Sequence, residues 1–374
     1  MNRSPKVVIS GGGTGGHIFP AISIAQEINK RYPQAWIQFI GANNRMEMSK
    51  IPESGFPIIG INIAGFQRKS ILKNLSLPIK ILLSLFKVYR LLKKWKPDAV
   101  VGTGGYVSGP SLFAAQKLSI PTLIQEQNSF AGLTNRLVSR KANAICVAYP
   151  EMEKFFPAKK VKLTGNPIRS DISKISLIGR NRKHSDKAKK NLGFDSTLPL
   201  VLVLGGSQGA KAINDCVELN INSWNKQNIQ ILWQCGSLYF QDLSQKVFET
   251  KYLKIKPFLN EMDKAYLASD IIISRAGAGS ISEICCTGSA SILIPSPNVA
   301  EDHQTKNAQN LADRDAAIYI DEANAKDQIG QLVINLIGDE DNLEQLRNNA
   351  LKISQPYAAQ EIVNQLEKCW SWKK

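Results

Sequence analysis

Short segments made almost wholly of apolar residues alternate with longer segments in which apolar and polar residues mix at helical spacing. A strand buried on both faces of a sheet is apolar throughout, whereas a helix that covers the sheet is apolar on one side. The alternation therefore predicts an α/β protein with parallel, doubly wound sheets. The predicted strands are residues 7–10, 36–40, 99–102, 122–125 and 144–147 in one series, and 200–204, 229–234, 271–274, 291–294 and 316–320 in a second.

A polar, basic segment, residues 171–190, separates the two series. It has no clear periodicity, so we predict a linker or an exposed insertion. A chain of 374 residues is long enough for two domains with separate cores. We therefore expect one domain on either side of this segment.

Residues 68–96 contain nine Lys or Arg and no acidic residue, with aliphatic residues between the cations. This pattern favours a surface that inserts apolar side chains into a membrane while its cations meet anionic headgroups. An ordinary core helix with a solvated basic face is the alternative. Nucleic acid is not expected, because the cations are interleaved with aliphatic residues and not with stacking aromatics. Pro78 interrupts the segment and predicts two shorter helices.

Composition narrows the class of protein further. The net charge of +16 indicates polyanionic partners such as nucleic acid, anionic lipid or a phosphorylated substrate. The six cysteines and three histidines lack the spacing of a metal site, so we expect no metal and reduced thiols. Neither a secretion signal nor a membrane-spanning apolar run is expected from the sequence.

A glycine-rich segment, residues 11–16, follows the first predicted strand and leads into a helical pattern that begins at His17. Glycines allow close backbone approach and a helix N-terminus favours an anion, so we predict a phosphate-binding loop. Three of its glycines also fit the dinucleotide motif G-x-G-x-x-G, which leaves an NADP-dependent oxidoreductase open. The acidic residue that a dinucleotide site needs after the next strand is missing until Glu47.

A second glycine-rich segment, residues 205–209, follows the strand at 200–204. Neither segment contains the Lys-Ser or Lys-Thr pair of a P-loop, so a P-loop NTPase is not expected. Two halves that both open with a glycine-rich turn predict a ligand site between them, at the carboxyl ends of the strands.

Residues 271–284 form a third strand, small-residue loop and helix start. Ser280 and Glu283 match a capping box, in which the carboxylate would only close the helix N-terminus. The small residues before them also leave room for a phosphate, and a carboxylate one turn inside could accept both hydroxyls of a ribose. Residues 301–307 leave a similar choice between a helix start capped by Asp302 and a sugar-binding edge.

Seven motifs, found in order along the chain, carry a resemblance to a known family. They are GGGTGGHIFPA, VGTGGYVSGP, QEQNSFAGLTNR, LTGNPIR, GGSQGAKAIN, SRAGAGSISEI and PSPNVAEDHQTKNA. The chain resembles the MurG family of glycosyltransferase family 28, the bacterial undecaprenyldiphospho-muramoylpentapeptide β-N-acetylglucosaminyltransferases. Gln125 departs from the family pattern, because many members carry His there.

The resemblance implies a GT-B fold, in which two Rossmann-like domains face each other across a cleft. Residues 1–167 would form the N-terminal domain, which binds the acceptor and docks on the membrane. Residues 168–345 would form the C-terminal domain, which binds UDP-N-acetylglucosamine (UDP-GlcNAc). Residues 346–374 would contain a helix that packs back on the N-terminal domain.

The resemblance also implies the reaction. N-acetylglucosamine would move, with inversion, from UDP-GlcNAc to the 4-hydroxyl of the MurNAc-pentapeptide of lipid I, giving the lipid II of peptidoglycan synthesis. The enzyme would use no cofactor and no metal. It would be a peripheral protein of the cytoplasmic face of the inner membrane, held there by residues 68–96. We expect His17 to be the general base, with Glu126 as the second candidate.

The residues that match the family motifs give the expected binding sites. The donor would contact Thr14, Gly15, Gly16, Asn128, Arg169, Ser207, Leu259, Ala278, Gly279, Ser280, Ile281, Ser282, Glu283 and Gln304. The acceptor would meet Gly13, Gly104, Gly105 and Tyr106. Within the donor set, Glu283 would hold the ribose, Leu259 would lie near the uracil, and Gln304 would contact the sugar hydroxyls.

Overall fold

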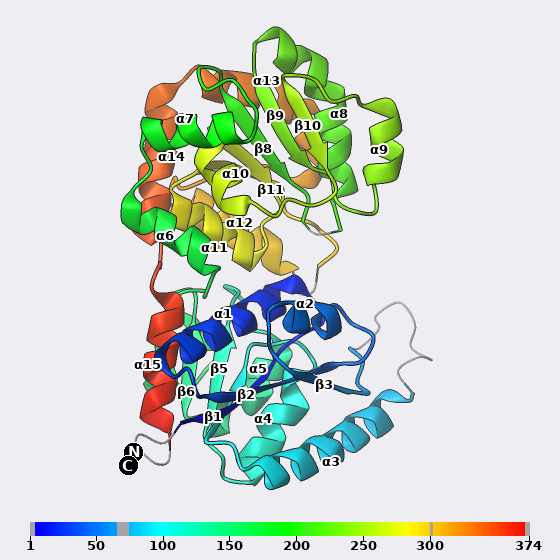
Figure 1. Ribbon diagram of the computed structural model, residues 1–374, viewed down its shortest axis with the longest axis vertical. Helices are drawn as coiled ribbons and strands as arrows, with labels where there is room; N and C mark the ends of the chain where they lie inside the picture. The colour runs from blue at the N-terminus through cyan, green and yellow to red at the C-terminus, as the bar shows by residue number, and fades with distance from the viewer. Residues whose placement is uncertain (1–3, 66–74, 207, 300–301, 371–374) are drawn as a thin grey trace. The chain divides into compact units, whose positions relative to one another are not determined.

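The computed structural model describes residues 4–65, 75–206, 208–299 and 302–370 (Figure 1). The chain divides into two compact units. Unit 1 is Met1–Arg169 together with Tyr357–Lys374, and unit 2 is Ser170–Pro356. Each unit contains one sheet whose strands all pair in parallel, as the apolar segments predict. Two Rossmann-like α/β domains of this kind are the components of a GT-B fold.

Unit 1 contains a seven-stranded sheet in the order β3-β2-β1-β4-β5-β6-β7. Successive side chains of a strand point to opposite faces, so Val7 and Ile9 lie in one core and Val8 in the other. The strands are β1 (Lys6–Ser10), β2 (Trp36–Ala42), β3 (Ile58–Ile61), β4 (Ala99–Gly102), β5 (Thr122–Glu126), β6 (Ala144–Val147) and β7 (Val161–Leu163).

Helices cover both faces of this sheet. One core contains residues of α1, α2 and α15, and the other contains residues of α3, α4 and α5. The helices are α1 (Gly15–Arg31), α2 (Glu47–Glu53), α3 (Leu77–Trp95), α4 (Ser108–Lys117), α5 (Leu133–Val138) and α15 (Ala358–Cys369). Among the described residues of this unit, short 3₁₀ helices span Ser139–Lys141, Met152–Lys154 and Ala158–Lys160.

Helix α15 joins unit 1 after the chain has completed unit 2, and Figure 1 shows it in red beside α1. Ile362, Val363 and Leu366 are fully buried in the core that α1 also lines. Arg31 of α1 fixes the pair of helices, because its guanidinium donates to Asn364 Oδ1 at 2.6 Å and to Glu367 Oε1 at 3.1 Å. The returning segment begins at Tyr357 and not at 346, since α14 packs on α11 and β12 of unit 2.

Unit 2 contains a six-stranded sheet in the order β10-β9-β8-β11-β12-β13. Helices α8, α9 and α13 cover one face, and α10 packs on the other against β8. The strands are β8 (Leu200–Leu204), β9 (Gln230–Gln234), β10 (Leu253–Lys256), β11 (Ile271–Ser274), β12 (Ala290–Leu293) and β13 (Ile318–Tyr319). The helices are α6 (Ser170–Ile178), α7 (Arg182–Asn191), α8 (Lys211–Lys226), α9 (Phe240–Lys246), α10 (Met262–Ala268), α11 (Ala278–Thr287), α12 (His303–Ala312), α13 (Glu322–Ile337) and α14 (Glu340–Ile353).

The prediction of a linker or exposed insertion at residues 171–190 is wrong. The segment forms α6 and most of α7, which pack on α10 and α11. Its polar composition misled the prediction, because some of its cations are buried and paired. Lys189 is only 5% exposed and donates from Nζ to Asp270 Oδ2 at 2.8 Å.

The prediction of two helices around Pro78 is also wrong for the part of residues 68–96 that the structure describes. Helix α3 runs without a break from Leu77 to Trp95. Pro78 lies in its first turn, where a backbone N–H would have no partner inside the helix, so the missing N–H costs no hydrogen bond. Residues 68–74 lie outside the described residues. In the described part of the chain, no helix has an apolar stretch long enough to cross a bilayer.

Candidate functional site

The glycine-rich segments lie where the strand order of each sheet reverses. In unit 1 the reversal falls between β1 and β4, which are followed by residues 11–14 and 103–107. In unit 2 it falls between β8 and β11, which are followed by residues 205–210 and 275–277. Ligands of open parallel sheets bind at the carboxyl ends of the strands at this point. Each unit therefore has one candidate binding region.

In unit 1, the first glycine loop is held by a buried carboxylate that the sequence analysis did not assign to a site. Glu47, at the start of α2, has no exposed surface. Its Oε2 accepts a hydrogen bond from Gly13 N at 3.1 Å, and its Oε1 accepts one from Ala42 N at 3.0 Å. A Cβ atom at residue 12 would lie 2.2 Å from Glu47 Oε1, so a larger residue there would displace the carboxylate from these hydrogen bonds. Glu47 thus binds the protein's own loop, and not a ribose at the end of β2.

We expect Glu47→Gln to lower the free energy of unfolding by about 1–3 kcal/mol, because the new NH₂ group would face a buried backbone N–H. Urea denaturation measures the effect. Glu53→Gln is the matched control on the same helix, since Glu53 forms only an exposed pair with Lys50 at 2.7 Å and should change stability by less than about 1 kcal/mol. Equal stability of the two variants would contradict the structural role of Glu47.

The two glycine loops of unit 1 meet at His17. The Nδ1 atom of His17 lies 3.1 Å from Thr14 Oγ1, and its carbonyl accepts a hydrogen bond from Thr103 Oγ1 at 2.8 Å. The imidazole packs against the turn after β4, where a Cβ atom at Gly104 would lie 2.8 Å from His17 Cδ2. Gly104 also has a φ of +96°, which excludes most other residues.

The predicted residues Gly13, Thr14, His17, Gly104, Gly105 and Tyr106 therefore form one cluster, which we call the unit 1 cluster. The ring of Tyr106 lies over the first loop, since a Cβ atom at Gly13 would be 3.2 Å from its Cε1 atom. Gly15 and Gly16 are the first two residues of α1, and Gly16 is exposed. The cluster therefore places the imidazole of His17 beside the N-terminus of α1, as the glycine-rich sequence predicts.

Glu126, the second candidate base, is bound by its own loop. Its Oε1 accepts from Asn128 N at 3.1 Å, and its Oε2 accepts from Gly132 N at 3.0 Å and Asn135 Nδ2 at 2.9 Å. Burial raises the pKa of the Glu126 carboxyl, while the hydrogen bonds from Asn135, Asn128 and Gly132 act in the opposite direction. The side chain therefore orders the turn between β5 and α5.

Gln127 is a residue of this region that the sequence analysis missed. It is 2% exposed, and its Nε2 donates to Thr103 O at 2.5 Å. Its Oε1 is buried and has no hydrogen-bond partner in the structure. A Cβ atom at Gly104 would lie 3.1 Å from His17 Nε2 and 3.4 Å from Gln127 Oε1, so both atoms border the same turn. Its position in the sequence, between the predicted site residues Glu126 and Asn128, is the signal that could have identified it.

In unit 2, helix α11 begins after a glycine. Gly277 is the N-cap, so the N-cap residue has no side chain with which to cap the helix. A Cβ atom at Gly279 would meet no atom within 4 Å, so space is open beside the first turn. The N–H groups of a first turn have no acceptors inside their helix, which makes such an end suitable for a diphosphate.

The predicted capping box at Ser280 and Glu283 is wrong. Ser280 lies inside the helix, and the carboxylate of Glu283 accepts a hydrogen bond on Oε2 from the hydroxyl of Tyr266 at 2.9 Å. Ile281 is buried, and Ser282 Oγ donates to Ala278 O at 2.8 Å. Glu283 thus lies one turn inside the N-terminus of α11 and is bound by Tyr266.

Two further predicted residues border this region. The backbone N of Leu259 donates to Gln234 Oε1 at 2.9 Å, and Gln234 Nε2 donates to Gly206 O at 3.1 Å. Gln234 therefore connects the loop after β10 with the glycine loop after β8. Ser207 of that glycine loop lies outside the described residues.

Asp302 is the N-cap residue of α12, but the predicted side-chain cap does not form. The side chain of Asp302 accepts from Thr305 Oγ1 at 2.7 Å and not from a backbone N–H. Gln304 Oε1 accepts from Ser296 N at 2.9 Å and so holds the loop after β12. We call Leu259, residues 278–283 and Gln304 the unit 2 cluster. The predicted donor residue Arg169 is the last residue of unit 1 before the chain enters α6.

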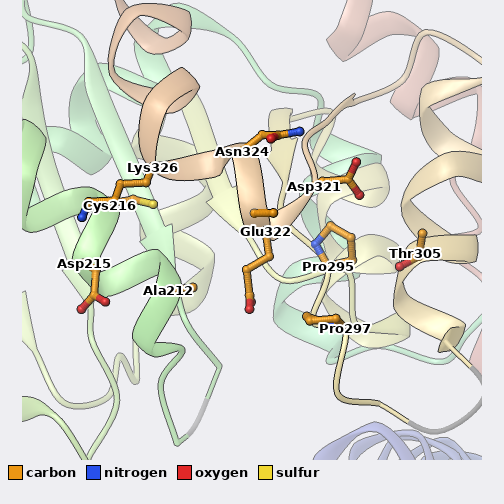
Figure 2. Close-up of a pocket in the computed structure, with 11 residues that line it drawn as sticks. Ala212, Asp215, Cys216, Pro295, Pro297, Thr305, Asp321, Glu322, Asn324 and Lys326 are labelled. Carbon is orange, nitrogen blue, oxygen red and sulfur yellow. The ribbon is translucent and has the colours of Figure 1, made fainter.

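A cavity of about 580 Å³ lies in unit 2 between α8, the end of β12 and the start of α13 (Figure 2). Its wall includes Asp215, Cys216, Pro295 and Glu322, and none of the predicted site residues lines it. Arg275 belongs to the same region, where it forms an ion pair with Glu322 at 2.5 Å and donates to Pro295 O at 3.0 Å. Arg275 therefore joins β11 to the β12 loop and α13.

Within the described residues, no three His, Cys, Asp or Glu side chains are grouped so that they could hold a metal ion. The six cysteines are free thiols, and all but Cys369 are buried. Burial raises the pKa of Cys146 and Cys285 to about 12, so these thiols are inert at neutral pH. Independence from metal remains a prediction.

Comparison with known proteins matches both units to domains of one family. The glycosyltransferase family 28 N-terminal domain matches residues 7–147, and the family 28 C-terminal domain matches residues 200–368. The UDP-N-acetylglucosamine–N-acetylmuramyl-(pentapeptide) pyrophosphoryl-undecaprenol N-acetylglucosamine transferase of Flavobacterium psychrophilum is 46% identical over 97% of this chain and 97% of its own. The transferase of the same name from Christiangramia forsetii is 44% identical over 98% of both chains. The crystal structure of Acinetobacter baumannii MurG matches with a TM-score of 0.76 and 30% identity, covering 97% of this chain and 99% of that one.

Proposed function

The chain belongs to glycosyltransferase family 28, and we propose that it transfers N-acetylglucosamine from UDP-GlcNAc to the 4-hydroxyl of the muramyl residue of lipid I, which yields lipid II. The observation that carries this proposal is the near-complete match, over both units, to relatives that bear the name of this transferase. The NADP-dependent oxidoreductase is not supported, because the family and its relatives are transferases.

In the proposed reaction, the acceptor hydroxyl attacks the anomeric carbon from the face opposite to UDP, so the configuration inverts. The bond from that carbon to the diphosphate oxygen breaks, and the hydroxyl proton passes to a base. His17 suits this role, because a proton on Nδ1 that is shared with Thr14 Oγ1 would make Nε2 the basic nitrogen. The rest of the unit 1 cluster would then bind the acceptor.

The unit 2 cluster would bind the donor. The positive end of the α11 dipole suits the diphosphate of UDP and would stabilise its charge as the sugar leaves. Glu283 would accept the ribose hydroxyls, Leu259 would contact the uracil, and Gln304 would contact the sugar. Thr14, Gly15, Gly16, Asn128, Arg169 and Ser207 complete the proposed donor site.

We further propose that α3 holds the enzyme on the cytoplasmic surface of the inner membrane. Ser84, Val88 and Leu92 form the buried stripe of this helix. A second apolar stripe points to solvent at the spacing i, i+3, i+4, i+7, a pattern that usually faces a core. This outward stripe consists of Ile79, Leu82, Leu83 and Phe86.

Cations surround the outward stripe. Lys80, Lys87, Arg90, Lys93 and Lys94 are exposed on the same helix, which has no acidic residue. Arg90 lies 5.6 Å from the ring centre of Phe86. An ordinary core helix does not need a second apolar stripe, whereas a helix that lies in an anionic membrane surface does.

The purified full chain should transfer labelled N-acetylglucosamine from UDP-GlcNAc to a short-chain analogue of lipid I. UDP-GlcNAc at about 100 times its Kd should stabilise the fold by about 2.7 kcal/mol, and NADPH should not. Stabilisation by NADPH alone would contradict the proposal. Stabilisation by UDP-GlcNAc without transfer would indicate a nucleotide-sugar-binding protein instead.

A further inference from the structure

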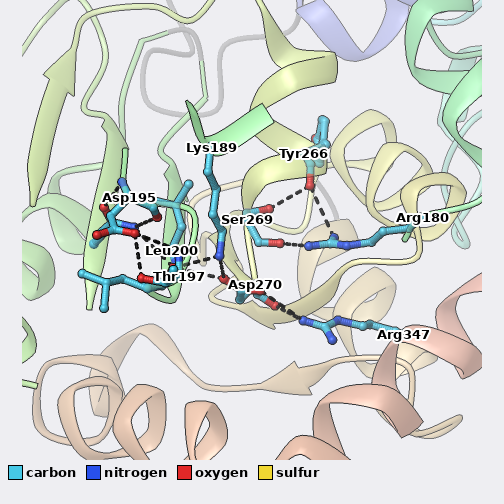
Figure 3. Close-up of polar contacts among 11 residues, drawn as sticks. Arg180, Lys189, Asp195, Thr197, Leu200, Tyr266, Ser269, Asp270 and Arg347 are labelled. Carbon is cyan, nitrogen blue, oxygen red and sulfur yellow. Dashed lines mark hydrogen bonds and ion pairs between the residues drawn. The ribbon is translucent and has the colours of Figure 1, made fainter. Parts of the chain in front are cut away.

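The turn between the short helices α6 and α7 contains an arginine that is partly buried against α10 of unit 2. Arg180 lies between the two helices and donates to Tyr266 O at 3.4 Å and to Ser269 O (Figure 3). It also donates to Ser289 Oγ at 3.2 Å. Burial lowers the pKa of the guanidinium to about 10, which leaves it charged at neutral pH. Two of its acceptors are carbonyls at the C-terminal end of α10, where a cation is favourable.

An ion pair beside Arg180 fixes α7 to the same region. Lys189 Nζ donates to Asp270 Oδ2 at 2.8 Å, and Asp270 Oδ2 also accepts from Leu200 N at 2.9 Å. Arg347 of α14 adds a bond to the carbonyl of Asp270 at 3.2 Å. The segment after α10 is therefore bound by Arg180, by Lys189 of α7 and by Arg347 of α14, as Figure 3 shows.

Tyr266, whose carbonyl accepts a hydrogen bond from Arg180, also binds Glu283. Tyr266 is 1% exposed, and its hydroxyl donates to Glu283 Oε2 at 2.9 Å. The bond uses one of the roughly four lone-pair positions of the carboxylate and fixes its plane. A carboxylate that accepts two adjacent hydroxyls must have a defined plane, because both hydrogen bonds depend on direction.

We propose that Tyr266 is a positioning residue for Glu283, and that Arg180 positions Tyr266. The inference rests on the proposed function, in which Glu283 binds the ribose of the donor. Neither Tyr266 nor Arg180 needs to touch the nucleotide. The segment that separates the two domains in the sequence would thus set the affinity of the enzyme for ribonucleotides.

The test compares two probes, UDP and 2′,3′-dideoxy-UDP, which lacks both ribose hydroxyls. Wild-type protein should bind UDP more tightly. In Tyr266→Phe, the Kd of UDP should rise about 5–20-fold, while the Kd of the dideoxy nucleotide should change less than about 2-fold. Isothermal titration calorimetry on the full chain measures both constants. The preference for UDP is the informative quantity, because a general loss of structure would weaken both probes equally.

Tyr319→Phe is the matched control. It removes a tyrosine-to-carboxylate hydrogen bond of the same unit, between Tyr319 and Asp321, and should leave the preference unchanged. Arg180→Lys keeps the charge but cannot reach three acceptors at once. It should lower the preference by a smaller factor, and the double variant with Tyr266→Phe should lose no more than Tyr266→Phe alone.

The possible results separate this inference from the proposed function. A wild-type protein without any preference for UDP would contradict the ribose role of Glu283, and with it the proposed function. A normal preference in Tyr266→Phe would overturn the positioning role alone. Equal weakening of both probes in that variant would also overturn it, because Tyr266 would then support only the fold.

Discussion

Replacing His17 by alanine should lower the turnover number by about 10²–10⁴-fold, the range expected when a general base is lost. The ring contacts Thr14 Oγ1 through Nδ1 at 3.1 Å and packs on Gly104, so its orientation is fixed before substrate binds. The measurement is steady-state transfer to a soluble lipid I analogue, with both substrates varied.

His17→Gln is the companion variant, since its amide can still donate or accept a hydrogen bond but cannot take up the proton. It should be as slow as His17→Ala while it binds the acceptor nearly as well as the wild type. A different result would refute the assignment: a variant in which only the apparent Michaelis constant of the acceptor rises would make His17 a binding residue.

Changing Leu82 and Phe86 together to glutamine should lower binding to anionic lipid vesicles by about 10²-fold or more. These side chains are 66% and 60% exposed, so the change removes little from the core. Inserting each into the membrane contributes about 1.5–3 kcal/mol. Vesicle sedimentation measures the binding, and transfer to a water-soluble acceptor should hardly change because that reaction needs no membrane.

The control changes two equally exposed apolar residues of unit 2. Leu219 and Phe248 are 58% and 76% exposed, and their replacement by glutamine should leave vesicle binding intact. Raising the salt concentration should weaken wild-type binding, since the cations of α3 are screened. If the α3 variant bound vesicles as well as the control, the membrane role of this helix would be wrong.

The central strands of both sheets were predictable, whereas three of the four edge strands were missed; the fourth, β13 (Ile318–Tyr319), lies within the predicted strand 316–320. The predictions for β4, β6, β8 and β11 agree with the structure residue for residue. The missed strands β3, β7 and β10 each have a neighbour on only one side. An edge strand is buried less completely, and Lys162, Lys254 and Lys256 break the apolar pattern in two of them.

The glycine loops of the site were predictable because their residues are adjacent in sequence. Their partners were harder to find, since these lie far away along the chain. Glu47 is 34 residues from the Gly13 N–H that it binds, and Arg180 is 86 residues from Tyr266. A single sequence does not show which distant residues will form pairs. A charged residue that is buried and paired therefore cannot be distinguished from one that is solvated. For the same reason the segment that contains Arg180 was predicted to be a linker.

Because α15 returns to unit 1, this unit is completed only after unit 2 has been synthesised. Residues 4–169 leave the ribosome first, but the face of α1 that α15 covers has no partner until residues 358–369 have been made. At about 5–20 residues per second, synthesis of residues 170–356 takes on the order of 10–40 s. During that interval the nascent first domain exposes the apolar surface that Val363 and Leu366 later bury. The apolar core of unit 1 is therefore completed only after unit 2 has been synthesised, whereas the residues of unit 2 are contiguous.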